Sequence, residues 1–416
     1  MTAPLPRPAT TKRLKYVVSL RRSRVEGSLD DRPYIGLENI ESSTGRLVGN
    51  PAATKESAPA ATGEAESLSN TFEPGDVLFG KLRPYLAKAW VAAFPGRCTT
   101  ELLVMQPVEA ESRFLRYVCL SRDFVDAVDG STFGSKMPRA DWDFIGNMAI
   151  PVPRIPQQRA IADYLDRETA RLDALVAAKE RVLGLLAEKR RALITRAVTR
   201  GLDPRAPLRD SGIPWLGEIP AHWETERSRW LFRERDQRSE TGEEELLTVS
   251  HLTGVTLRSE KDVNMFEAET TEGYKICLSG DLVINTLWAW MGAMGVSPVN
   301  GIASPAYNVY QPGPRLEPDY VDTLVRLPVF AQEVTRYSKG VWSSRLRLYP
   351  EGFFEVFLPV PSIDEQRAIV AHIAKETEKL DELRVATERT TVLLKERRAA
   401  LIAAAVTGQL DARATA

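Results

Sequence analysis

The stretch PVPRIPQQRAIADYLDRETARLDALVAAKE, which begins at Pro151, occurs again as PVPSIDEQRAIVAHIAKETEKLDELRVATE, which begins at Pro359. The two stretches align at a constant offset without a gap, and about 30 of 57 aligned positions between residues 150–206 and 358–414 are identical. Chance and composition do not produce this density of identities, so the chain contains an internal duplication. The duplication predicts an architecture of two similar halves.

Each repeat copy has the pattern of a long helix, because apolar residues recur on one face of residues 158–200. A seven-residue ladder runs through each copy. Its members are Leu165, Leu172, Leu186 and Leu193, interrupted by Lys179, and Ile373, Leu380, Leu394 and Leu401, interrupted by Thr387. One such copy fits an ordinary core helix equally well. Two copies favour a pair of antiparallel helices that act as a spacer, because an apolar stripe on a charged helix needs a partner.

Local signals mark the ends of both helices. Ser362 with Glu365 forms a capping box at the start of the second helix. Gly201 and Gly408 follow the last turns, where glycine favours helix termination. Gly184 lies inside the first helix, so we expect a bend or a close packing contact there.

Upstream of each repeat copy, the two halves agree only in outline. Each begins with a basic, aromatic stretch, KRLKYVVSLRRSR from Lys12 and ERSRWLFRERDQR from Glu226, and continues with a strand-like run. A Gly-Asp pair then leads into an apolar strand, with Asp76 in one half and Asp281 in the other. The segment 43–69 is rich in Ala, Ser, Thr and Glu, which predicts a solvated loop.

We therefore predict an α+β protein with a pseudo-twofold internal repeat. Two globular mixed α/β domains, residues 1–150 and 207–357, are joined by two long antiparallel helices within the spacers 151–206 and 358–416. The halves are expected to share a scaffold and to differ in surface.

The composition limits the classes of function. Lys+Arg total 55 against 56 Asp+Glu, so the chain cannot coat nucleic acid by net charge, and any DNA-binding surface must be local. Segment 207–357 has a net charge of −7, so its basic residues would have to cluster on one face. Without a long apolar run or an apolar signal core, we expect a cytoplasmic protein with no membrane partner. Three cysteines without a CxxC pair and only three histidines predict no disulfide framework and no metal site.

The common signatures of catalysis are absent from the sequence. There is no GxGxxG after a strand, no phosphate-binding loop, no HExxH and no GxSxG. The stretch NTLW at Asn285 lacks both prolines of an adenine methyltransferase signature. The stretch GDVLFGK at Gly75 suggests a nuclease, but its second copy, GDLVINT, lacks the lysine. We therefore interpret the Gly-Asp pairs as structural.

What remains is a different set of cationic, polar and aromatic residues on each half, which are the residue types that contact phosphates and base edges. The candidate DNA-binding residues are Lys81, Arg83, Tyr85, Ser135, Lys136 and Arg139 in the first half, and Trp288, Ser343, Ser344, Arg345 and Arg347 in the second. The alternative for each charge is a solvated surface position. Trp288 and its neighbour Trp290 are equally compatible with a place in the core.

The motif PVPxIxxQRAI at residues 151–161 and 359–369, each followed by a long helix ending in LIxxAVTxxLD, resembles the specificity subunit of type I restriction-modification systems. The stretch SGIPWLGEIPAHW from Ser211 is also similar to the linker that opens a target-recognition domain in that family. The resemblance implies a non-catalytic subunit whose two variable domains each recognise one half of a split, asymmetric target in double-stranded DNA. It also implies that the helices set the spacing and dock two methyltransferase subunits.

By the same resemblance, catalysis belongs to partner subunits and this chain holds no cofactor. S-adenosylmethionine is expected in the methyltransferase subunits, and ATP and Mg in the restriction and translocase subunits. Leu175 and Val176 are candidate docking residues, because a two-helix rod leaves one side bare. Two other classes remain open: a self-contained methyltransferase or nuclease with cryptic motifs, and a coiled-coil adaptor with no role on DNA.

Overall fold

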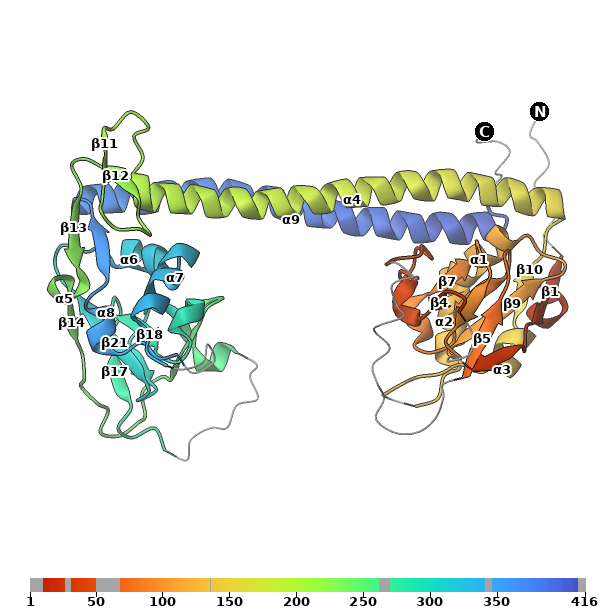
Figure 1. Cartoon of the computed structure of the whole chain (residues 1–416), viewed down its shortest axis with the longest axis horizontal. Helices are drawn as coiled ribbons and strands as arrows, with labels where there is room; N and C mark the ends of the chain where they lie inside the picture. Colours follow the sequence, from red (N-terminus) through yellow and green to blue (C-terminus); the bar gives the residue numbers. More distant parts are fainter. Residues whose placement is uncertain are drawn as a thin grey trace. The chain divides into compact units, whose positions relative to one another are not determined.

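The computed structural model describes residues 10–26, 31–49, 68–134, 136–261, 270–340 and 346–410. The chain divides into two compact units. Unit 1 comprises residues 1–181 and 387–416, and unit 2 comprises residues 182–386. Each unit contains one globular domain and a part of each of two long helices (Figure 1).

The two long helices are α4 (Ile155–Arg200) and α9 (Ile363–Val406). In unit 1, Asp173 of α4 pairs with Arg398 of α9, and Glu180 pairs with Lys395. Partner numbers fall along α9 as they rise along α4, so the helices are antiparallel there. In unit 2, Arg190 of α4 pairs with Asp381 of α9. The predicted helix pairing is confirmed within each unit.

The apolar ladder lies on the side of the two helices that is buried or half-buried. Four of its members are buried, namely Leu165, Leu172, Ile373 and Leu380. The remaining members, Leu186, Leu193, Leu394 and Leu401, are half-buried. Both glycine stops are confirmed, because Gly201 and Gly408 have φ of 69° and 76°. Of the predicted capping box, the structure shows the hydrogen bond that the Glu365 N–H donates to Ser362 Oγ at 3.3 Å.

Gly184 does not make the expected close contact. A Cβ built on it would meet nothing within 4 Å, and α4 is continuous through it. The expectation of tight packing was wrong, because this part of α4 carries no globular domain against the Gly184 face.

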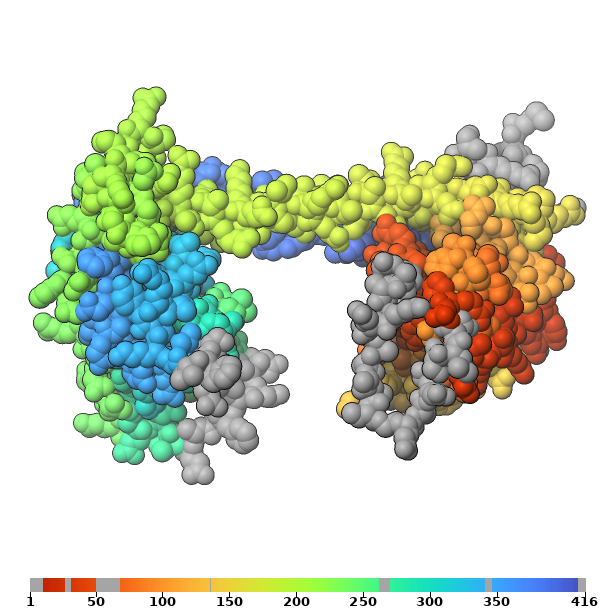
Figure 2. Space-filling model, viewed as in Figure 1, coloured from red at the N-terminus to blue at the C-terminus, as the bar shows by residue number. Residues whose placement is uncertain are grey.

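The described part of the globular domain of unit 1 contains two four-stranded sheets, one two-stranded sheet and three α-helices. The strands are β1 (Thr11–Arg13), β2 (Val18–Leu20), β3 (Arg24–Glu26), β4 (Tyr34–Ile35), β5 (Leu68–Phe72), β6 (Val77–Gly80), β7 (Ala89–Val91), β8 (Gly96–Cys98), β9 (Leu102–Pro107) and β10 (Ala149–Pro151). The helices are α1 (Ser112–Leu120), α2 (Arg122–Gly130) and α3 (Trp142–Asn147). One sheet has the order β2-β9-β6-β7 and the other β3-β5-β8-β4, while β1 pairs with β10. Figure 2 shows the start of α4, in yellow, lying directly on this domain.

The globular domain of unit 2 repeats this plan. Its strands are β11 (Leu208–Asp210), β12 (Glu218–Pro220), β13 (Glu224–Arg227), β14 (Phe232–Glu234), β15 (Leu247–Ser250), β16 (Gly254–Leu257), β17 (Lys275–Cys277), β18 (Leu282–Asn285), β19 (Met294–Val296), β20 (Gly301–Ala303), β21 (Tyr307–Pro312) and β22 (Phe357–Val360). The helices are α5 (Ser228–Leu231), α6 (Pro318–Val325), α7 (Pro328–Tyr337) and α8 (Pro350–Phe353). The sheet β14-β21-β18-β19 matches β2-β9-β6-β7 strand for strand, and β13 pairs with β22 as β1 does with β10. The predicted mixed α/β class is confirmed.

The Gly-Asp pairs form the same buried ion pair in both domains. Asp76 lies 2.7 Å from Arg21 Nε, and Asp281 lies 2.6 Å from Arg235 Nε. Each carboxylate is about 97% buried and also accepts the backbone N–H three residues before it. Hydrogen bonding to the carboxylate raises the pKa of both arginines. The structural interpretation of these pairs is confirmed, because all their polar atoms serve the turn into the strand.

The repeated glutamine of the QRAI motif attaches each domain to its helix. Gln158 is fully buried and accepts the Glu111 N–H at 2.7 Å, and Gln366 accepts the Glu317 N–H at 2.8 Å. The duplicated helix therefore carries a duplicated anchor for the start of a domain helix.

The predicted loop 43–69 differs from the structure at its C-terminal edge. Residues 50–67 lie outside the described residues. Ser69 is 2% exposed within β5, so the solvated segment ends earlier than predicted. Ser43 is exposed as predicted, and its carbonyl accepts a hydrogen bond from Arg398 of α9.

Candidate nucleic-acid interface

In each domain, the two ends of one segment are bonded to each other and lie next to the strand that follows the Gly-Asp pair. We call residues 133–139 loop 1 and residues 339–347 loop 2. An antiparallel bridge closes each loop, between Phe133 and Arg139 in loop 1 and between Lys339 and Arg347 in loop 2. The residue after each loop donates its N–H to the residue that follows the Gly-Asp strand. Ala140 donates to Lys81 O at 2.9 Å, and Leu348 donates to Thr286 O at 3.1 Å. The loops are therefore equivalent parts of the shared frame.

In unit 1, the structure brings together most of the predicted DNA-binding residues. Arg83, Lys136 and Arg139 are exposed, and Lys81 is half-buried. Lys81 and Arg139 line one hollow of about 670 Å³ together with apolar residues of loop 1. Ser135 lies outside the described residues. The arrangement offers cations around a concave surface, which suits phosphates and base edges.

Arg139 already has a partner within the domain. Its Nε donates to Glu101 Oε2 at 3.1 Å, and its Nη2 lies 3.0 Å from Glu101 Oε1. This two-pronged contact fixes the plane of the guanidinium, which remains half exposed. A fixed, half-exposed guanidinium can present its remaining donors to a ligand without losing side-chain entropy on binding.

Tyr85 lies in a different hollow from Lys81. It belongs to the short 3-10 helix Pro84–Leu86, is 53% exposed, and lines a hollow of about 510 Å³ between the domain and the long helices. Arg83, at the start of this turn, has a φ of 52°, and its N–H donates to Pro138 O at 2.8 Å. The segment 83–87 is thus tied to loop 1 on one side and borders the helices on the other.

In unit 2, the exposed residues at the equivalent place are different. Trp288 is 51% exposed, and its ring stacks on half-buried Trp290 at 6.2 Å. The Trp290 indole N–H donates to Leu287 O at 3.0 Å, which orients both rings. Arg347 is exposed. Three predicted residues of loop 2, namely Ser343, Ser344 and Arg345, lie outside the described residues.

The sequence analysis missed two apolar residues of loop 1. Phe133 is 81% exposed and Met137 is 55% exposed, beside the cations described above. The stretch GSTFGSKMPRADWDF from Gly130 contains the predicted residues Ser135, Lys136 and Arg139, but the apolar residues among them are of types that usually belong to the core. Its glycines and proline were the available signal of a loop.

A second missed pair occupies equivalent places at the start of the domains. Tyr16 is 63% exposed and Trp230 is 73% exposed. Each lies two residues after a residue, Leu14 or Ser228, whose N–H donates to the carbonyl of Met148 or Val356, just before the strand that leads into the long helix. Lys15 lies 5.4 Å from the Tyr16 ring. Both residues belong to the basic, aromatic stretch that opens each half, and the aromatic residues of that stretch were the available signal in the sequence.

The predicted docking residues on α4 differ in exposure. Leu175 is 44% exposed, whereas Val176 is half-buried and lines the same hollow as Tyr85. The repeat shows further exposed leucines that the sequence analysis did not name. Leu383 is the counterpart of Leu175, and Leu185 and Leu393 are counterparts of each other, with exposures of 56%, 62% and 54%.

Within the described ranges, no group of three or more His, Cys, Asp or Glu side chains could hold a metal ion. No described helix is long and apolar enough to cross a membrane.

The chain resembles known proteins in sequence and in fold. No family model matches the chain. It is 22% identical over 208 residues to the type I restriction enzyme EcoDI specificity subunit of Escherichia coli, a match that spans 49% of this chain and 41% of that relative. The chain therefore matches less than half of the length of this curated protein.

Two solved structures share the fold over nearly the whole chain. One is the HsdS subunit from Thermoanaerobacter tengcongensis, with a TM-score of 0.54, 18% identity and coverage of 98% of this chain and 99% of that one. The other comes from work on complex assembly and conformational transition of the type I R-M system, with a TM-score of 0.65, 20% identity and coverage of 98% and 100%. The chain has the fold of these proteins and resembles type I specificity subunits in sequence.

Proposed function

We propose that this chain is the non-catalytic DNA specificity subunit of a type I restriction-modification complex and acts in the cytoplasm. Its two globular domains each recognise one half of a bipartite, asymmetric DNA target. Its long helices dock two methyltransferase subunits, which supply S-adenosylmethionine and adenine methylation. Restriction and translocase subunits supply the chemistry that needs ATP and Mg.

One observation carries this proposal: the chain builds one buried frame twice and places different residues on it. The Arg21–Asp76 and Arg235–Asp281 pairs agree within 0.1 Å. The described exposed residues of loop 1 are cationic and apolar, and loop 2 also shows exposed cations at Lys339 and Arg347, whereas the segment after the Gly-Asp strand exposes Arg83 and Tyr85 in one domain and Trp288 in the other. Matched frames with unmatched surfaces suit two recognition domains with different base preferences.

The helices support the docking part of the proposal. Within unit 1, exposed leucines occur on both helices, at Leu175 of α4 and Leu393 of α9. Within unit 2, their counterparts are Leu383 of α9 and Leu185 of α4. Each unit therefore offers the same pair of exposed leucines, which suits two copies of one partner.

Methylome sequencing of the host with and without this gene tests the proposal. We expect deletion to remove one bipartite adenine-methylation motif and to leave all others unchanged. An unchanged methylome would favour the coiled-coil adaptor. Tight binding of S-adenosylmethionine to the purified chain alone, measured by isothermal titration, would favour the self-contained methyltransferase.

A further inference from the structure

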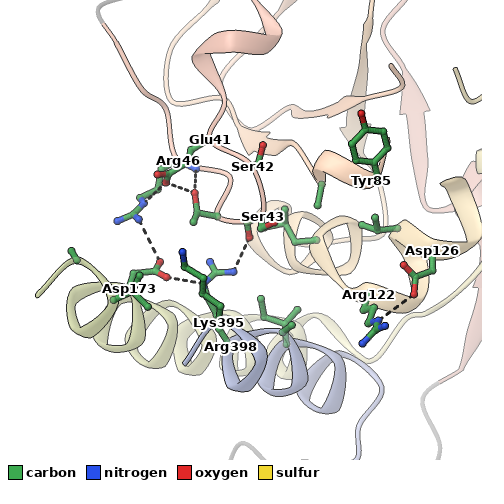
Figure 3. Close-up of a pocket in the computed structure, with 18 of the residues that line it drawn as sticks. Glu41, Ser42, Ser43, Arg46, Tyr85, Arg122, Asp126, Asp173, Lys395 and Arg398 are labelled. Carbon is green, nitrogen blue, oxygen red and sulfur yellow. Dashed lines mark hydrogen bonds and ion pairs between the residues drawn. The ribbon is translucent and has the colours of Figure 1, made fainter. Parts of the chain in front are cut away.

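Arg398 of α9 connects the helix pair of unit 1 to its globular domain. Its Nε donates to Asp173 Oδ1 on α4 at 2.9 Å, and its Nη1 donates to the backbone carbonyl of Ser43 at 2.7 Å (Figure 3). Both ion-pair side chains are only about a tenth exposed. The guanidinium fork thus joins two helices and one domain loop in a single buried contact.

The loop that Arg398 holds is also bonded to the segment that carries Tyr85. The Ser43 N–H donates to Ala87 O at 3.0 Å and to Leu86 O at 3.3 Å. Ser43 therefore bonds the helix through its carbonyl and the 83–87 segment through its N–H. Because the Arg83 N–H in turn bonds loop 1 at Pro138 O, the chain of contacts continues from Arg398 to the proposed DNA surface.

Among the described residues, the left-handed backbone conformations of non-glycine residues all lie on this same path. Three non-glycine residues among those described have a positive φ, namely Ser43 at 62°, Arg83 at 52° and Ala87 at 47°. Such conformations are unfavourable for residues with a Cβ and persist where surrounding contacts impose them, often at functional sites. All three belong to the two segments that Arg398 and Ser43 connect.

The repeat supplies a natural comparison in unit 2. Arg190 and Asp381 are the counterparts of Arg398 and Asp173, and they form the same ion pair at 2.5 Å. Their side chains are 41% and 43% exposed, and the described part of unit 2 contains no loop carbonyl bonded to Arg190. The ion pair is therefore a property of the repeat, whereas the connection to a domain loop belongs to unit 1.

We propose that Arg398 is a positioning residue for DNA recognition by unit 1. Through Ser43 it fixes the 83–87 segment, and with it loop 1, in one orientation on the helices that dock the methyltransferase. This inference rests on the function proposed above. It predicts that loss of Arg398 relaxes base preference in one half-site and leaves the other unchanged.

The test compares methylomes of cells that express the methyltransferase subunit with wild-type chain, Arg398→Ala, Arg398→Lys or Arg190→Ala. Arg398→Lys keeps a cation beside Asp173 but lacks the fork that also reaches Ser43, so it tests positioning even where the alanine variant folds poorly. Arg190→Ala is the matched control. The half-site of unit 1 is identified as the one altered by Arg139→Ala.

With both Arg398 variants, we expect methylation of sites with one mismatched base in the unit 1 half-site to rise about tenfold, since one mismatch ordinarily costs a factor of about 5 to 150. Arg190→Ala should leave both half-sites as sharp as in the wild type. Equal relaxation of both half-sites, or none with Arg398→Lys, would overturn the inference. Absence of any bipartite motif with the wild-type chain would instead refute the proposed function.

Discussion

Arg21 reaches Asp76 through Nε and Nη2 at 2.7 and 3.3 Å, and Arg235 reaches Asp281 through the same atoms at 2.6 and 3.2 Å. The two domains therefore share the geometry of a buried ion pair, although their surfaces differ. A carboxylate that is about 97% buried and bonded on every side holds a turn in place and is not available for catalysis.

Replacement of Arg21 should destabilise unit 1. In Arg21→Ala the Asp76 carboxylate stays buried without its charge partner, and we expect the free energy of unfolding of unit 1 to fall by about 3 kcal/mol. Hydrogen exchange of the β6 amides measures this change. The adjacent exposed residue offers a control, since Arg22→Ala should change stability by less than about 0.5 kcal/mol. Lost methylation with unchanged β6 protection would contradict the structural role.

Lys136 should contribute to binding of DNA by the assembled complex. It is exposed and forms no ion pair with the other described residues, so its charge is available to a phosphate. We expect Lys136→Ala to lower affinity and to reduce the slope of log K against log salt by about 1. Lys189→Ala, on an exposed face of α4, is the control and should leave the slope unchanged. Equal slopes for Lys136→Ala and wild type would remove Lys136 from the interface.

Gly184 should tolerate a methyl group with a gain in stability. The position is helical and open, so Gly184→Ala should raise the free energy of unfolding by about 0.5 to 1 kcal/mol through the lower backbone entropy of the unfolded chain. Thermal denaturation measures the shift. Gly146→Ala in α3 should act oppositely, because its Cβ would lie 3.0 Å from the Trp142 ring. Destabilisation by Gly184→Ala would reveal a contact that the open surface does not show.

Charge at the exposed leucines should disrupt assembly while leaving the chain folded. Leu175→Glu and its counterpart Leu383→Glu change positions that are 44% and 56% exposed, so circular dichroism and melting temperature should stay close to wild type. Each single variant is expected to lose one of two methyltransferase copies, because a carboxylate cannot be buried in an apolar interface. Native mass spectrometry counts the copies. Retention of two copies by the double variant would place docking elsewhere on the chain.

The sequence predicted those features that local patterns determine. The repeat, the seven-residue ladder around Leu165 and the glycine stops such as Gly201 determined both helices and their pairing. The stretch after Asp281 lacks the lysine that follows Asp76 in the first half, and this difference was enough to interpret Asp76 as structural. In each case, the type of one residue or one spacing along the chain was enough to predict the local structure.

Other features depend on contacts between distant segments, which spacing does not reveal. Ser43 adopts a left-handed conformation only because Arg398 and Ala87 bond its two backbone groups, and a serine gives no sign of this in the sequence. Phe133 is exposed because its loop leaves the core, whereas its residue type predicts burial. At Gly184 the error is the opposite, because we expected a close packing contact and a Cβ built there would meet nothing within 4 Å.

Exchange of one domain tests the central claim most directly. Residues 10–151 would be replaced by the corresponding segment of a relative with a known target, in a chain that keeps both long helices and the second domain. The account predicts that methylome sequencing then shows a hybrid motif, in which one half-site comes from the relative and the other half-site and its partner adenine stay unchanged. A motif altered in both halves, or one identical to the original, would contradict separate recognition by two domains.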